Sequence, residues 1–232
     1  MSTENESPAA AYARLLSLAV HELRTPASVV GGYLRMLQRD TDSALTDRQR
    51  KMIDEAEKSC ARMVALIAEM SEVSKLDAGA VTLARERLDL FPLVRDVANS
   101  VHEAAERDVR LEVRGEPSGA SILGDGPHLK RALDAVFRAI LREQPAACTV
   151  VVERRVETHR DGVHSAVLVV ASDARVQAAY EATPGAFDEK RGGMGLALPL
   201  ARRVIERHGG RIWAPRDTEE RGVAIVSIPL SE

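Results

Sequence analysis

The sequence predicts an α + α/β chain: an antiparallel helical hairpin that forms a dimeric four-helix bundle, followed by a two-layer α/β sandwich. Three observations predict this. Residues 9–76 carry two long stretches of apolar residues at helical spacing. In the second stretch, apolar residues recur every seven positions. Beyond residue 80, short apolar strand patterns alternate with helical ones. We therefore divide the chain into a disordered tail (1–8), a helical domain (9–79) and an α/β domain (80–232).

The helical domain begins with a helix from residue 9 to about residue 40, followed by a turn over residues 40–44. Thr46 then caps a second helix, and Gln49 stands three residues on, where it can complete a capping box. This helix runs to about residue 76. Its heptad rows are Ile53, Cys60 and Ile67, and Ala56, Met63 and Met70.

The heptad rows indicate which protein surface buries the apolar side chains of the hairpin. Two helices alone cannot bury both apolar rows, so we expect the hairpin to dimerise into a four-helix bundle. A hairpin within a monomer is the alternative, and it needs a cover that the remaining sequence does not obviously provide.

The second half reads as an alternation of strands and helices. Asp125-Gly-Pro127 opens one of the helices, since proline suits a first helical turn. The expected strands or extended segments are 81–90, 110–113, 122–123, 149–157, 165–172, 211–214 and 222–228, and the expected helices are 91–106, 128–143 and 195–208.

Composition narrows the classes of function. The chain has 232 residues, of which 45% are hydrophobic and 29% charged, and its net charge of −3 argues against nucleic acid as the main partner. It lacks a run of eighteen apolar residues, so we expect no membrane span, and its polar, acidic start does not read as a signal peptide. We expect a cytoplasmic protein.

Cys60 and Cys148 lie far apart without the spacing of metal ligands, and we predict no metal site.

The most informative motif is the hexapeptide HELRTP at residues 21–26 of the first helix. Thr25 lies four residues after His21, on the same helix face. Glu22 can hold one ring nitrogen of His21 and leave the other as a nucleophile. Pro26 removes the hydrogen bond to the Glu22 carbonyl and is expected to bend the helix. The plainer interpretation is a surface histidine followed by a proline kink.

These six residues resemble the phospho-acceptor box of two-component sensor histidine kinases. The resemblance covers about residues 12–230. It implies that His21 carries a phosphoryl group, that Glu22 assists its transfer, and that Thr25 orients the water that removes phosphate from the partner. The implied partners are a response-regulator receiver domain, which brings its own Mg²⁺, and a second copy of the chain bound through the hairpin.

The second half resembles the ATP-binding domain of the same family. Its strongest motif is GGMGLAL at residues 192–198, followed by a helix and then HGGRIW at 208–213. The resemblance implies that Gly193, Gly195 and Leu196 belong to a loop that cradles the phosphates of ATP. It also implies that Asp173 binds the adenine amino group and that Mg²⁺ accompanies the nucleotide. Glycine loops at a helix N-terminus suit this role because their amides approach the anion closely.

Other nucleotide motifs of the family are eroded here. Ala135 and Ala139 stand where the family has two asparagines, the second of which holds Mg²⁺, and alanine carries no oxygen ligand. Both glycines that follow the family's aspartate are missing after Asp173, and the lid over ATP is shortened. Asp134 or Glu143 could act as a displaced metal ligand. ATP and Mg²⁺ are therefore doubtful cofactors.

Three hypotheses follow. In the first, His21 exchanges phosphate with a receiver aspartate, and ATP-dependent autokinase activity is weak or lost. In the second, the chain is an active histidine autokinase with an atypical Mg-ATP site. In the third, it is a non-catalytic dimeric scaffold that regulates another kinase.

Overall fold

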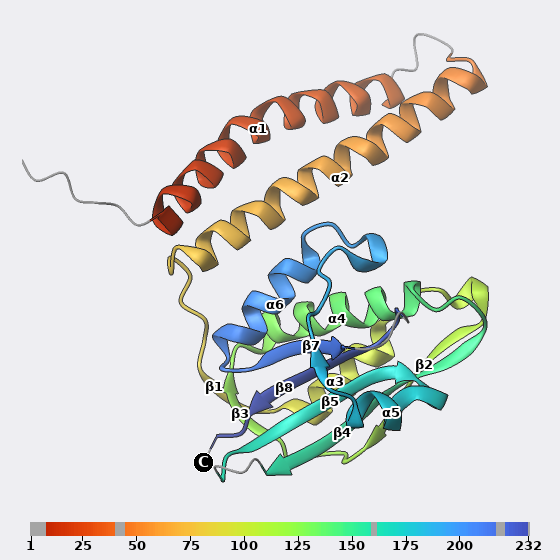
Figure 1. Ribbon diagram of the computed structural model, residues 1–232. Helices are drawn as coiled ribbons and strands as arrows, with labels where there is room; N and C mark the ends of the chain where they lie inside the picture. Colours follow the sequence, from red (N-terminus) through yellow and green to blue (C-terminus); the bar gives the residue numbers. More distant parts are fainter. Residues whose placement is uncertain (1–7, 40–44, 159–161, 217–220, 232) are drawn as a thin grey trace, which may run out of the picture. The chain divides into compact units, whose positions relative to one another are not determined.

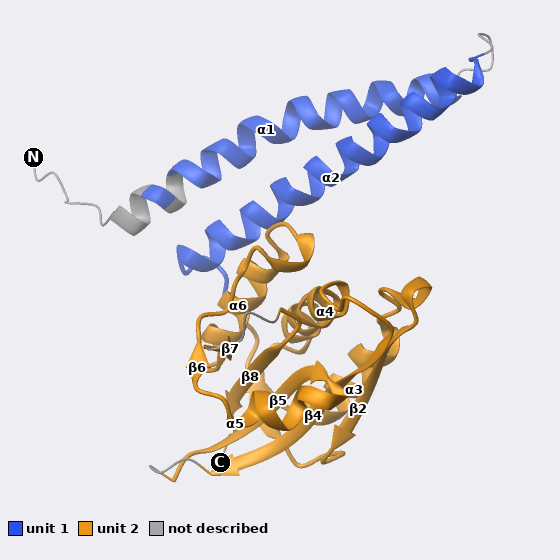
Figure 2. Ribbon diagram, turned by 45° about the vertical axis from the view of Figure 1, so that its right-hand side comes forward, with its two compact units in different colours: residues 1–82 blue, residues 83–232 orange. Residues whose placement is uncertain are grey.

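The computed structural model describes residues 8–39, 45–158, 162–216 and 221–231, and the chain divides into two compact units, residues 1–82 and 83–232 (Figure 2). The predicted tail lies outside the described residues except for Pro8, which begins the first helix. The predicted turn over residues 40–44 also lies outside them.

The first unit is a hairpin of two long helices, α1 (Pro8–Arg39) and α2 (Asp47–Asp77), which run side by side (Figure 1). The capping box at the start of α2 is confirmed. The Gln49 backbone N–H donates to Thr46 Oγ1 at 3.3 Å, and the Thr46 N–H donates to Gln49 Oε1 at 2.9 Å. These two hydrogen bonds satisfy backbone amides that the first helical turn leaves without partners.

One heptad row of α2 faces α1 and the other is largely exposed. Cys60 and Ile67 are buried, and the Cys60 thiol donates to the Ala27 carbonyl of α1 at 3.2 Å. Met63 of the second row is 47% exposed. Large apolar side chains on α1 are exposed as well, among them Leu15, Val30 and Leu37. The hairpin thus buries one apolar seam and leaves apolar side chains of both helices on its surface.

The second unit is built on a mixed six-stranded sheet of order β2-β4-β5-β8-β7-β6 (Figure 1). Strands β2 and β4 are parallel, whereas the remaining neighbours are antiparallel. The six strands are β2 (Val109–Gly115), β4 (Cys148–Thr158), β5 (His164–Ser172), β6 (Pro184–Gly185), β7 (Arg211–Pro215) and β8 (Ala224–Pro229). A separate antiparallel pair joins β1 (Glu86–Asp89) to β3 (Ser121–Gly124).

Three helices form the second layer: α3 (Leu90–Ser100), α4 (Gly126–Arg142) and α6 (Ala197–Arg207). They bury alternate residues of the central strands, such as Leu168 and Val170 of β5. The opposite face of the sheet carries its own apolar cluster, in which Val169 and Ile225 pack with Ala179 of the short helix α5 (Val176–Glu181). The predicted two-layer sandwich therefore has a small additional cover on its outer face.

Two local predictions differ from the structure. The helix expected over 91–106 ends at Ser100, because Val101 is extended and Ala104 adopts a left-handed conformation (φ 61°). The chain then makes a 3₁₀ turn over Ala105–Arg107 before β2 begins. Helix α5 was not expected at all, since six residues are too few to show a helical period.

Asp125 caps α4 and ties it to the start of the second unit. Its carboxylate accepts from the His128 N–H and from the Ala84 N–H, both at 3.0 Å. Its own N–H donates to His208 Nε2 at 2.9 Å. Burial by itself raises the pKa of Asp125, but the hydrogen bonds from His128 and Ala84 outweigh it and lower the pKa to about 2. The carboxylate is thus held in its charged form.

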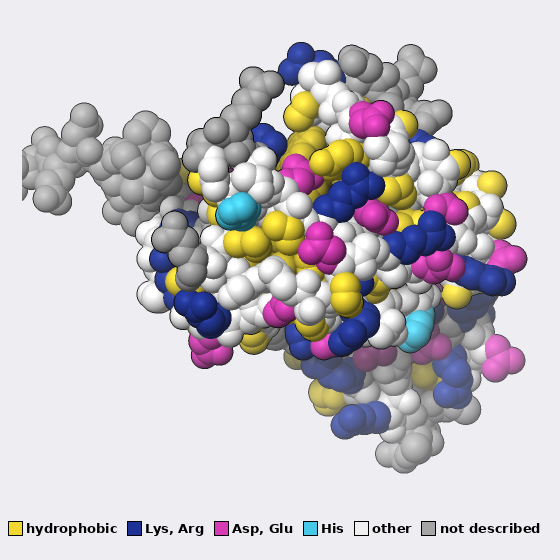
Figure 3. Space-filling model, turned by 90° about the horizontal axis from the view of Figure 1, so that it is seen from below, with side chains coloured by type: hydrophobic (Ala, Val, Ile, Leu, Met, Phe, Trp, Pro, Cys, Tyr) yellow, Lys and Arg dark blue, Asp and Glu magenta, His cyan; other side chains and the backbone are white. Residues whose placement is uncertain are grey.

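Basic and acidic side chains are interspersed on the face shown in Figure 3, in keeping with the small net charge. That face does not present the continuous basic stripe that nucleic-acid binding favours. Among the helices of the described residues, none is long and apolar enough to cross a bilayer.

Candidate functional site

The side chains of His21, Glu22 and Thr25 are all exposed on α1. Their exposure follows from the position of the hairpin's seam. Val20, immediately before the histidine, is only 3% exposed and packs with Ala27 and with Ile67 of α2. Successive helical residues turn by 100°, so His21 lies beside the seam rather than in it. The imidazole is held on a packed helix and its side chain remains exposed.

Pro26 lies inside α1, one residue after Thr25, and the helix continues through it to Arg39. The missing proline N–H leaves the Glu22 carbonyl without its usual intrahelical donor. The helical domain thus keeps every residue of the HELRTP motif in one accessible stretch of helix, as predicted from the sequence.

In the second unit, the helix that would bind the metal has no oxygen ligand at the expected positions. Ala135 is 5% exposed and Ala139 is fully buried within α4. The alternative ligands proposed from the sequence are already paired with arginines. Asp134 accepts from Arg138 at 2.8 Å, and Glu143 lies 3.4 Å from Arg191. Magnesium requires several oxygen ligands in near-octahedral geometry. These residues, as arranged, do not fit a Mg²⁺ site.

Asp173 follows β5 directly and opens a 3₁₀ turn over Asp173–Arg175. Its side chain is 57% exposed and accepts a hydrogen bond from Arg114 of β2, which also donates to Glu112 at 2.9 Å. Hydrogen bonds to Glu112 and Asp173 raise the pKa of Arg114. The structure therefore places the Asp173 carboxylate in a surface ion pair with β2, which β4 separates from β5 in the sheet.

The glycine loop lies before α6, where the sequence predicts it. Gly193 and Gly195 are exposed and adopt left-handed conformations (φ 62° and 65°), which glycine tolerates and other residues avoid. Leu196 is the N-cap residue of α6. The helix expected over 195–208 is confirmed with a slightly later start at Ala197. A helix N-terminus of this kind attracts anions.

A buried ion pair lies next to this loop. The side chains of Arg191 and Glu143 are 8% and 6% exposed, and Arg191 Nε lies 3.4 Å from Glu143 Oε2. The same carboxylate oxygen accepts from the Gly222 N–H at 2.8 Å. Burial lowers the pKa of Arg191, and the charge of Glu143 opposes that shift. Sequence reasoning missed this pair, because its two residues are 48 positions apart and neither belongs to a recognisable motif.

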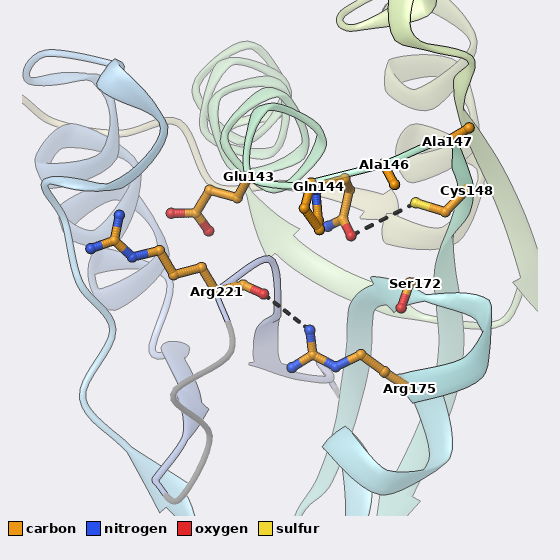
Figure 4. Close-up of a pocket in the computed structure, with 9 residues that line it drawn as sticks. Glu143, Gln144, Ala146, Ala147, Cys148, Ser172, Arg175 and Arg221 are labelled. Atoms are coloured by element: carbon orange, nitrogen blue, oxygen red, sulfur yellow. Dashed lines mark hydrogen bonds between the residues drawn. The ribbon is translucent and has the colours of Figure 1, made fainter.

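A cavity of about 460 Å³ opens beside Glu143 at the end of α4 (Figure 4). Its polar lining comes from Glu143, Gln144, Ser172, Arg175 and Arg221. Asp173 does not belong to this lining, nor do Gly193, Gly195 or Leu196. The residues expected to bind a nucleotide are thus not brought together around this cavity.

Comparison with protein families identifies both units. The phospho-acceptor domain His Kinase A matches residues 11–79. The family described as histidine kinase-, DNA gyrase B-, and HSP90-like ATPase matches residues 124–232.

Curated relatives resemble most of this chain. GacS of Pseudomonas protegens is 29% identical over 225 residues, which are 90% of this chain and 24% of GacS. DivL of Caulobacter vibrioides is 27% identical over 204 residues, or 86% of this chain and 25% of DivL. The hybrid signal transduction protein dokA of Dictyostelium discoideum is 28% identical over 217 residues, or 87% of this chain and 13% of dokA. The chain spans about a quarter or less of each.

Solved structures share the fold. ShkA, in complex with AMPPNP, has a TM-score of 0.67 at 22% identity, covering 94% of this chain and 45% of ShkA. ThkA, in complex with the response regulator protein TrrA, has a TM-score of 0.55 at 19% identity, covering 94% of this chain and 61% of ThkA. These similarities confirm the predicted order of a helical hairpin followed by a mixed α/β sheet.

Proposed function

This chain belongs to the two-component sensor histidine kinase family, and we propose that it carries phosphate on His21 and exchanges it with a response-regulator aspartate, with ATP-dependent autophosphorylation weak or lost. The observation that carries this proposal is a contrast between the two units. His21, Glu22 and Thr25 are exposed together on α1, whereas the metal-binding positions of α4 are the buried methyl groups of Ala135 and Ala139.

The transfer to His21 needs only groups that α1 and the receiver supply. The lone pair of one ring nitrogen attacks phosphorus, the P–N bond forms, and the P–O bond to the receiver's aspartate breaks. The aspartate leaves as a carboxylate. Glu22 holds the proton on the other ring nitrogen and so favours the reacting tautomer. Thr25, one turn away, orients the water that hydrolyses the phosphoryl group of the receiver.

Transfer from ATP, by contrast, would need a metal ion to neutralise the charge that develops on the phosphates. Asp134 and Glu143, the remaining acidic candidates near α4, are held by arginines. A nucleotide could still bind weakly at the glycine loop, without efficient transfer.

We propose a homodimer through the hairpin, with a receiver domain as the partner that docks on it. The exposed apolar side chains of α1 and α2, including Leu15, Val30 and Met63, support the dimer, because burial of such surface drives helix association. The solved complex of ThkA with TrrA supports a receiver domain as the partner.

The test uses receiver domains phosphorylated with labelled acetyl phosphate and mixed with the full chain. We expect label to move to the wild-type chain and to be absent from His21→Ala. His102→Ala is the matched control, because His102 is an exposed histidine in the other unit, and it should accept label normally. Failure of the wild type to take phosphate from any receiver would favour the third hypothesis, a non-catalytic scaffold.

A further inference from the structure

A buried arginine, Arg191, holds the loop that carries Gly193 and Gly195. We propose that Arg191, through Glu143, latches the glycine loop onto α4, so that the loop is held in one conformation without any nucleotide. This inference rests on the proposed function, in which the ATP site is weak or lost. It assigns to Arg191 and Glu143 a positioning role at that site: their ion pair sets the conformation in which the loop would meet a nucleotide.

The first support is the burial of the pair. Both side chains are more than nine-tenths buried, yet Arg191 Nε and Glu143 Oε1 have no hydrogen-bond partner within the described residues. A buried charge is costly unless another charge compensates it, so each of these residues depends on the other. Removal of either partner should therefore favour a conformation in which the remaining charge reaches water.

The second support is the close approach of the loop to α4. A Cβ atom on Gly192 would lie 2.8 Å from Ala139 Cα and 3.0 Å from Ala139 Cβ. Gly192 also has a φ of 64°, which a side chain would strain. The absence of a Cβ at 192 and the small side chain at 139 together allow this contact. An asparagine at 139, with its longer side chain, would push the loop away.

The third support is a set of contacts that hold the loop on two further sides. Arg191 Nη1 donates to the Val223 carbonyl at 2.6 Å, and the guanidinium lies 5.0 Å from the centre of the Phe187 ring. From α4, Arg142 Nη1 donates to the Gly192 carbonyl at 3.2 Å. The loop is thereby tied to α4 and to the start of β8. Phe187 is buried by this arrangement, at 7% exposure.

Hydrogen exchange of the full chain, followed by mass spectrometry without nucleotide, tests the latch. Glu143→Gln removes the charge and keeps the shape, and Arg191→Ala removes the other partner. In both variants we expect exchange in peptides covering residues 188–196 and 221–224 to rise by about tenfold or more, with β5 unchanged. Glu112→Gln is the matched control. It weakens the exposed pair between Glu112 and Arg114 on β2 and should leave the loop unchanged.

Unchanged loop exchange in both variants would overturn the latch, and so would a wild-type loop that exchanges as fast as an unstructured peptide. A uniform rise over α4, β5 and the loop would also overturn it, because the pair would then hold the whole unit. These outcomes do not depend on His21. Label transfer to His21 can fail while the loop behaves as expected, and the reverse holds as well.

Discussion

Replacement of Asp125 by alanine should destabilise the second unit by an amount that depends on pH. Asp125 is the N-cap of α4, and its carboxylate accepts from the backbone of both His128 and Ala84. The loss of an N-cap costs about 1 kcal/mol. The fall of the pKa from 3.8 to about 2 corresponds to about 2.5 kcal/mol at most. Because the side chain is 11% exposed and partly screened by water, we expect a total near 2 kcal/mol.

The sign of the pH dependence follows from the lowered pKa. Above about pH 5 the carboxylate is ionised in both the folded and the unfolded chain, so its full contribution is present. As the pH falls through 3.8 toward 2, the unfolded chain binds a proton first and the contribution is lost. By pH 3, the contribution of the lowered Asp125 pKa to the free energy of unfolding has fallen by about 1 kcal/mol.

Urea denaturation followed by circular dichroism between pH 3 and pH 8 measures this effect. The difference between wild type and Asp125→Ala should be constant from pH 5 to pH 8 and should shrink below pH 4. Asp96→Ala, which removes an exposed carboxylate of α3, serves as the control and should change stability little at any pH. A difference that is equally large at pH 3 and pH 7 would refute the electrostatic part of the reasoning.

Three further predictions concern separate parts of the chain. Thr25→Ala should slow dephosphorylation of a receiver by about tenfold, in the range of single positioning groups, while label transfer to His21 stays within about twofold; equal loss of both activities would refute the role of Thr25. Arg154→Met should lower the free energy of unfolding of the second unit by about 1–3 kcal/mol, because buried backbone carbonyls lose their donor; an unchanged denaturation midpoint would refute this. Thr46→Ala should lower the stability of the hairpin by about 1 kcal/mol through loss of the capping box. Thermal melting of the full chain, monitored by hydrogen exchange in peptides from residues 1–82, measures this loss of stability.

The sequence predicted the parts of the structure that local patterns determine. The heptad spacing of Cys60 and Ile67 gave the buried seam, and Thr46 with Gln49 gave the start of α2. These features depend on residues within one or two helical turns, where sequence and geometry are directly linked.

The pairings missed by the sequence join distant residues. Arg191 meets Glu143 across 48 positions, and Asp173 meets Arg114 across 59 positions. Such pairs depend on strand order and on the path of the chain between strands, neither of which a local pattern encodes. The segment after Asp173 is an example: its helix α5, which the sequence did not predict, packs on the outer face of the sheet.

The central claim is that His21 receives its phosphate from a receiver domain and not from ATP. Incubation of the full chain with labelled ATP and Mg²⁺ tests this claim most directly. We predict that wild type and His21→Ala show the same background, while wild type accepts label from a phosphorylated receiver. Acid-labile label that ATP places on the wild type and that His21→Ala abolishes would contradict the account, and would establish the chain as an autokinase with an unusual metal site.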